Sequence, residues 1–184
     1  QSVSKLASEE SAGTASEPSA PAEDSAAPVA DAGTIARGPW DIEELPEPAK
    51  NLVRVDLGAL QIPARQGMAL RMEVDRTSKR VIAANVTMRQ SNIQLQAFAA
   101  PKTSGLWDEI RAQIASSIQA QGGAVQEANG PFGKELLALL PVRDPQGKVG
   151  RRPVRFLGVD GPRWFLRGVV TGAALVDPAT AREM

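Results

Sequence analysis

The spacing of apolar residues predicts β-strands in the stretch that begins near residue 52. Apolar and polar residues alternate over 68–75 and strictly over 92–98, and a period of two is typical of a half-buried strand. Met68, Met72 and Met88 are interpreted as core residues. We predict a short antiparallel meander of four strands: 52–62 with a kink near Gly58, then 68–74, 80–89 and 92–98.

One amphipathic helix is predicted over about residues 105–121. Ser104 or Gly105 can cap its start, and Gly122 with Gly123 ends it. Its apolar residues are spaced three and four apart, which places them on one face. This stripe consists of Leu106, Trp107, Ile110, Ile114 and Ile118.

The remaining residues predict more strands and a second helix. Residues 134–142 are interpreted as a buried strand, although their leucines would also suit a helix. A hairpin is predicted over about 151–159 and 163–171, and Asp177 with Pro178 begins a helix that we expect to continue past Met184. The predicted fold class is α+β, with antiparallel sheet of about seven to eight strands packed on the main helix.

The hairpin contains the most distinctive stretch of the chain, residues 155–167, with three arginines and three aromatic residues. Because Pro162 has no N–H to donate, the sequence predicts a three-residue loop, 160–162, which pairs Val159 with Arg163. In that register Arg155 lies opposite Arg167 on one face. On the other face, the ring of Trp164 lies over the bare backbone of Gly158.

Like charges opposite one another destabilise a sheet, so this arginine pair needs a counter-charge. An anionic partner would supply it; the alternatives are Asp160, Glu135 or the protein's own acidic tail. A second basic group, Arg143, Lys148, Arg151 and Arg152, could extend the first into a stripe. The candidate anion- or partner-binding residues are therefore Arg155, Arg163, Arg167, Arg151 and Arg152.

Charge and composition divide the chain into three parts. Residues 1–36 are predicted to be a disordered acidic tail rich in Ala, Ser and Pro, residues 37–50 an extended docking arm or linker with Trp40, Ile42 and Leu45, and residues 51–184 a single domain. Ten acidic and two basic residues give residues 1–48 a net charge of −8, and the rest carries +8. The tail can therefore compete with an anionic partner.

The absence of Cys and His narrows the possible chemistry. It excludes Cys/His zinc sites and catalysis of the Ser-His-Asp or Cys-His kind, and we predict no metal, no cofactor and no catalytic residue. Glu127 and Glu135 flank one turn, but strand alternation does not place them clearly on one face. No apolar run approaches the roughly 18 residues of a membrane span.

Four segments together resemble an uncharacterised family of high-GC Gram-positive bacteria, the domain of unknown function 3710. The likeness covers about residues 37–184 and implies a cytoplasmic bacterial protein, with no activity attached. The segments are Trp107–Arg111, Gly122–Glu127, Gly130–Leu136 and Arg155–Arg167.

We therefore expect a non-enzymatic binding or regulatory module whose arginine face meets an acidic protein or a nucleic-acid backbone. Two alternatives remain open. One is an enzyme that works through a carboxylate in a closed pocket, and the other is an adaptor that oligomerises through a sheet edge.

Overall fold

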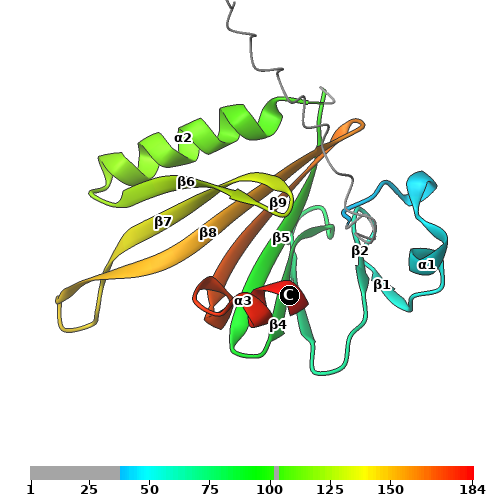
Figure 1. The fold of residues 1–184 in the computed structure, drawn as a ribbon, viewed down its shortest axis with the longest axis horizontal. Helices are drawn as coiled ribbons and strands as arrows, with labels where there is room; N and C mark the ends of the chain where they lie inside the picture. The colour runs from blue at the N-terminus through cyan, green and yellow to red at the C-terminus, as the bar shows by residue number, and fades with distance from the viewer. Residues whose placement is uncertain (1–37, 102–103) are drawn as a thin grey trace, which may run out of the picture. The chain divides into compact units, whose positions relative to one another are not determined.

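The computed structural model describes residues 38–101 and 104–184. The predicted acidic tail, 1–36, lies outside the described residues. The elements (Figure 1) are η1 (Ile42–Glu44), α1 (Glu47–Lys50), β1 (Arg54–Asp56), β2 (Gln61–Pro63), β3 (Ala69–Val74), β4 (Val81–Met88), β5 (Ser91–Ala99), α2 (Leu106–Ala120), β6 (Ala124–Gly130), β7 (Gly133–Arg143), β8 (Val149–Gly161), β9 (Trp164–Gly172), η2 (Ala173–Leu175) and α3 (Pro178–Glu183).

Seven of the strands form one antiparallel sheet in the order β3-β4-β5-β9-β8-β7-β6. Two meanders, β3 to β5 and β6 to β9, are joined where β5 pairs with β9. The α+β class predicted from the sequence is confirmed, and the leucine-rich segment 134–142 is a strand rather than a helix.

The predicted first strand, 52–62, is wrong, because the chain folds there into a small separate hairpin. Val55 of β1 pairs with Ile62 of β2. Gly58 turns the chain with a φ of +87°, which glycine adopts without a steric penalty. The Oδ1 atom of Asp56 accepts a hydrogen bond of 2.8 Å from the Gly58 N–H. The kink expected at Gly58 is therefore a reversal.

Helix α2 covers one face of the sheet, which we call the helix face. Trp107 is buried against Phe165 and Ala100, with Phe156 packed beside them, and α2 contacts β6, β7 and β8 (Figure 1). The apolar stripe predicted for this helix supplies these contacts. The helix face therefore has its core over the half of the sheet that runs from β9 to β6.

The β1–β2 hairpin covers the opposite face, which we call the hairpin face. Leu57 and Ile62 are buried there against Ala84 and Val86 of β4. The two cores thus lie on opposite faces and over different halves of the sheet.

The methionines predicted as core residues divide between buried and exposed positions. Met88 is buried and Met68 packs at the margin of the second core, but Met72 is 50% exposed. Met72 lies in β3, an edge strand of the sheet, and the small hairpin does not extend over it. The interpretation of Met72 as core is wrong for this reason.

Candidate functional site

The turn between β8 and β9 differs from the predicted one. Gly161 pairs with Trp164, so the loop has two residues, Pro162 and Arg163. Pro at the first loop position and a φ of +66° at Arg163 are the pattern of a type II turn. In this turn the missing N–H of Pro162 lies in the loop and costs no ladder hydrogen bond. The predicted three-residue loop is therefore wrong.

This correction separates the two central arginines. Arg155 pairs with Val170, and Arg167 pairs with Gly158. Relative to the prediction the register has shifted by an odd number of residues, and an odd shift moves side chains to the opposite face. Arg155 therefore lies on the hairpin face and Arg167 on the helix face, so they do not form a pair across the strands.

Arg155 has an acidic partner inside the protein. Its Nε lies 3.6 Å from Oε2 of Glu135, whose side chain is 5% exposed. Burial raises the pKa of Glu135, and the nearby Arg155 guanidinium opposes that rise. Glu135 was one of the alternative counter-charges expected from the sequence. Glu127 lies on the helix face, paired with Leu136, so the two glutamates form no carboxylate pair.

Arg167 also has its contacts within the fold. A guanidinium NH2 group donates to the side-chain oxygen of Gln96, and its guanidinium carbon lies 5.6 Å from the centre of the Phe98 ring. Arg163 is exposed at the tip of the β8–β9 turn. Of the three arginines in the most distinctive segment, Arg163 is exposed, whereas Arg155 and Arg167 are half-buried.

The tryptophan that lies over Gly158 is Trp107 of α2 rather than Trp164. A Cβ atom at Gly158 would come within 2.2 Å of the Trp107 ring, so only glycine fits there. The Trp164 ring nitrogen instead donates to Oδ2 of Asp41 at 3.0 Å. The sequence predicted correctly that an indole needs this glycine, but it could not identify the indole.

Asp160 caps α2 from the distant hairpin. Its carboxylate accepts hydrogen bonds from the Gly105 N–H at 3.0 Å and the Trp107 N–H at 3.2 Å. Gly105, one of the two expected caps, occupies the N-cap position and has no side chain to do this. A carboxylate at a helix start satisfies free N–H groups and interacts favourably with the helix dipole.

Sequence reasoning missed a buried arginine, Arg111, beside this cap. Its Nε donates to Glu127 at 2.8 Å, its NH1 lies 2.7 Å from Asp108, and its guanidinium lies over the Trp107 ring. The hydrogen bond to Glu127 is the main reason that the pKa of Arg111 is raised and that of Glu127 lowered. The sequence did contain a signal for its burial: Arg111 lies four residues after Trp107, on the buried stripe of the helix.

A hollow of about 440 Å³ lies over this network. Trp107 and Arg111 line it from α2, Lys134 from β7, and Gly158 and Asp160 from β8. Three of the four segments that carry the family resemblance supply its walls, and Glu127 of the remaining segment accepts a hydrogen bond from Arg111. Each of the four family segments therefore contributes at least one residue to a structural network around the start of α2.

The second basic group lies on a part of the sheet that has no third strand. The β7–β8 pairing runs out to Arg143 and Val149, whereas β6 pairs with β7 only as far as Leu139 and β9 with β8 only as far as Arg155. Residues 140–153 are thus a two-stranded arm, which we call the ribbon. Figure 1 shows it projecting beyond the other strands.

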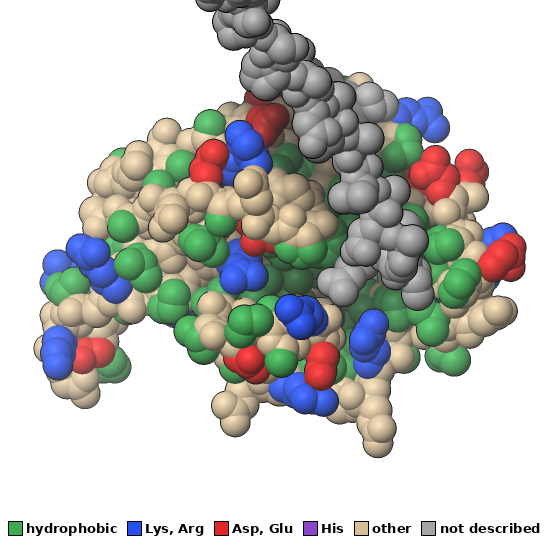
Figure 2. Space-filling model, in the orientation of Figure 1, with side chains coloured by type: hydrophobic (Ala, Val, Ile, Leu, Met, Phe, Trp, Pro, Cys, Tyr) green, Lys and Arg blue, Asp and Glu red, His purple; other side chains and the backbone are tan. Residues whose placement is uncertain are grey.

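Four exposed basic residues and one acidic residue lie on the ribbon. Asp144 accepts hydrogen bonds from two N–H groups of its own loop, those of Gln146 and Lys148. Within the described ranges, none of the four bases is in an ion pair. Figure 2 shows basic side chains on this projecting arm and an acidic one near its end. The bases are Arg143, Lys148, Arg151 and Arg152.

The fold and these sites define an α+β domain with a network around one helix start and a projecting basic arm. A family model described as a protein of unknown function, DUF3710, matches residues 38–184, and the chain belongs to this family. No curated protein and no solved structure matches the chain.

Two further searches cover only the described part of the chain. None of its helices is both long and apolar enough to cross a membrane. It also contains no group of three or more acidic side chains placed to hold a metal ion.

Proposed function

We propose that this protein is a non-enzymatic binding or regulatory module that contacts an acidic protein surface through the ribbon. The observation that supports this most is the set of four exposed bases without an ion pair on an arm that has no third strand. In keeping with the family resemblance, we place its activity in the bacterial cytoplasm.

The construction of the ribbon supports a binding role. A two-stranded hairpin without further strands is marginally stable in water, and like charges on it repel one another. Arg143 pairs with Val149, and Arg151 pairs with Pro141. Because Pro141 and Arg143 are two residues apart on β7, both arginines lie on the same face of the ribbon. An acidic partner would relieve this repulsion and cover Val149, which is 60% exposed.

The composition of the ribbon favours protein over nucleic acid as the partner. Residues 140–153 contain no aromatic residue, and single-stranded nucleic acids are usually bound by aromatic stacking. Charge alone can still attract the phosphate backbone of a duplex, so the test must distinguish binding of nucleic acid from binding of an acidic protein.

The site proposed here keeps Arg151 and Arg152 from the sequence prediction and adds Arg143 and Lys148. Arg155 and Arg167 are left out because they contact Glu135, Gln96 and Phe98. Arg163 lies in the β8–β9 loop, at the other end of β8 from the ribbon.

A charge-matched comparison tests this proposal. In the full chain, one variant replaces Arg143, Arg151 and Arg152 by Gln, and a control replaces three bases of the β3–β4 turn, Arg76, Lys79 and Arg80, by Gln. Binding to polyglutamate is measured at low salt. We expect the ribbon variant to lose at least about tenfold in affinity and the control to lose much less.

Equal losses in the two variants would show that net charge, and not the ribbon, governs binding, and this would overturn the proposal. If the ribbon bases were needed to bind a short DNA duplex and the protein did not bind polyglutamate, the inferred partner would be nucleic acid and not an acidic protein.

The acidic N-terminal segment is proposed to act as an intramolecular competitor for the same bases. Residues 1–48 carry a net charge of −8. Deleting residues 1–36 should therefore raise the affinity for polyglutamate at low salt and steepen its salt dependence. Unchanged binding after the deletion would exclude this competition and leave the ribbon proposal intact.

A further inference from the structure

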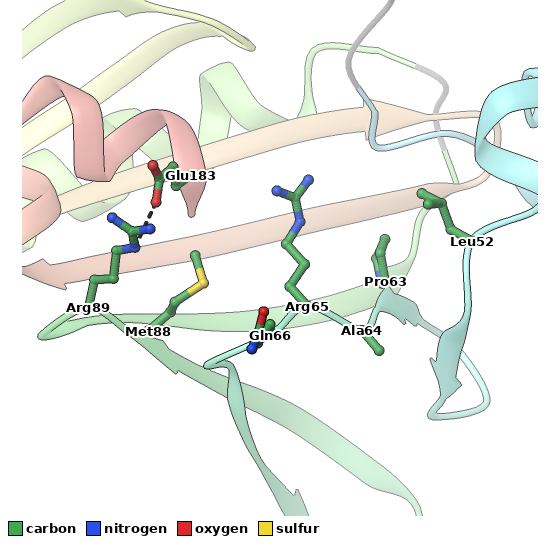
Figure 3. Close-up of a pocket in the computed structure, with 8 residues that line it drawn as sticks. All are labelled: Leu52, Pro63, Ala64, Arg65, Gln66, Met88, Arg89 and Glu183. Carbon is green, nitrogen blue, oxygen red and sulfur yellow. Dashed lines mark ion pairs between the residues drawn. The ribbon is translucent and has the colours of Figure 1, made fainter.

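A second hollow, of about 370 Å³, lies on the hairpin face between the end of β2, the β4–β5 turn and α3. Its walls include the apolar side chains of Leu52, Pro63 and Met88 and three charged side chains: Arg65, Arg89 and Glu183. Figure 3 shows Arg65 extending between the Arg89–Glu183 pair on one side and Pro63 with Leu52 on the other. Its size is that of a site for a small ligand.

The hollow carries an excess of positive charge. Arg89 binds Glu183 through its Nε at 2.7 Å. Arg65 makes no ion pair with any of the residues that the structure describes. The hollow therefore contains two guanidinium groups and one carboxylate, and that carboxylate pairs with Arg89 alone. A guanidinium holds carboxylates well because its donors form a planar fork.

The backbone that presents Arg89 adopts an unusual conformation. Arg89 and Gln90 form the two-residue turn between β4 and β5, with φ values of +47° and +60°. Such turns normally use Asn or Gly, because a side chain at positive φ is strained. The Gln90 carbonyl holds the turn in place by accepting from the Ala173 N–H at 3.1 Å. Strain of this kind is concentrated at functional sites.

We propose that this hollow is a binding site for a small aliphatic carboxylate. Its head group bridges Arg65 and Arg89, and its chain lies along Leu52, Pro63 and Met88. The pair with Glu183 shows that the Arg89 guanidinium can bind a carboxylate from this direction. The side chain of Glu183 is 45% exposed, and exposed ion pairs are weak, so a ligand can displace it at small cost. Glu183 is thus a competitor built into the chain.

Titration of hexanoate into the full chain, followed by calorimetry, tests the site. Arg65→Gln should weaken binding by about tenfold or more, since it removes a charged hydrogen-bond donor. Glu183→Gln should strengthen binding severalfold, because the competing carboxylate is gone. Arg71→Gln, an exposed arginine of β3 that faces away from the hollow, is the matched control and should bind like the unchanged protein.

Hexylamine and hexyl phosphate serve as comparison probes. Equal binding of hexylamine would show a purely apolar contact, and tighter, Arg65-dependent binding of hexyl phosphate would show a phosphate site; both overturn the carboxylate proposal. The proposal would also be overturned if the Glu183→Gln protein did not bind hexanoate, or if the Arg65→Gln protein bound it as tightly as the unchanged protein. The ribbon variant should bind hexanoate normally, which separates this site from the proposed partner surface.

Discussion

The two ends of β8 carry the same kind of side chain and use it differently. At the end that pairs with β9, Arg155 lies against buried Glu135, and across the hairpin Arg167 contacts Gln96 and Phe98. At the end that forms the ribbon, Arg151 and Arg152 are exposed, and neither is in an ion pair within the described residues.

The difference follows from the number of neighbouring strands. In the middle of the sheet β8 has β7 on one side and β9 on the other. Arg155 of β8 and Arg167 of β9 are therefore partly buried and need partners. In the ribbon each strand has one neighbour, and the side chains remain in water. A dense cluster of charged and aromatic residues in the sequence can therefore mark an internal network, while a plainer run of charges marks the free surface.

The largest expected effect is a difference in stability between substitutions at two glycines of β8. A Cβ at Gly158 would lie 2.2 Å from the Trp107 ring, whereas one at Gly150 meets only Val142, at 3.6 Å. Gly158→Ala should lower the free energy of unfolding by about 3 kcal/mol through overpacking. Gly150→Ala should change it by less than about 0.5 kcal/mol. Urea unfolding of both variants measures this difference, and equal effects would contradict the contrast between the two ends.

A smaller effect is expected from two arginines of β8. Arg155→Met leaves the Glu135 carboxylate buried without its partner, which should cost about 2 kcal/mol of unfolding free energy. Arg151→Met removes an exposed charge and should cost less than about 0.5 kcal/mol. Thermal unfolding compares the two. A stable Arg155→Met protein would mean that water or another group solvates Glu135 and that Arg155 is free for a partner.

The next effect in size is on stability, and it compares two aspartates that both accept hydrogen bonds from backbone N–H groups. Asp160 receives the Gly105 and Trp107 N–H groups at the start of α2, and Asp144 receives two N–H groups of its exposed loop. Asp160→Ala should cost about 1.5 kcal/mol, the upper range for loss of a helix cap, and Asp144→Ala about 0.5 kcal/mol. Hydrogen exchange should increase in the first turn of α2 in the Asp160 variant only.

Much of the fold could be predicted from the sequence, because strands and helices have local periods. The strands at 68–74, 80–89 and 92–98 and the helix at 105–121 agree with β3, β4, β5 and α2 to within two residues. The segment 52–62 could not be resolved in this way, because an apolar run with a glycine inside fits both a kinked strand and a hairpin.

The candidate site was harder to predict, because it depends on contacts between distant segments. The loop at Pro162 has two solutions: a three-residue loop over 160–162, and a two-residue turn that requires a positive φ at Arg163. Nothing local indicates that Arg163 adopts this φ. The choice decides on which face Arg155 and Arg167 lie. The pairing of Arg111 with Glu127 likewise depends on β6 packing beside α2.

The smallest expected effect is a pH dependence of the free energy of unfolding. It shows whether burial or the pairing with Arg155 has the larger effect on the pKa of Glu135. Burial raises its pKa above the ordinary value of 4.5 in the folded protein. As pH rises from about 4.5 through the raised pKa, the unfolded chain ionises first and the native state loses stability. Glu135→Gln does not titrate, so its free energy of unfolding should increase relative to the unchanged protein over this window. Urea unfolding from pH 4 to 8 measures the difference. A difference that falls with pH would mean that attraction to Arg155 exceeds the cost of burying Glu135, and the contrast between the paired Arg155 and the unpaired arginines of the ribbon would then be larger than their exposure indicates.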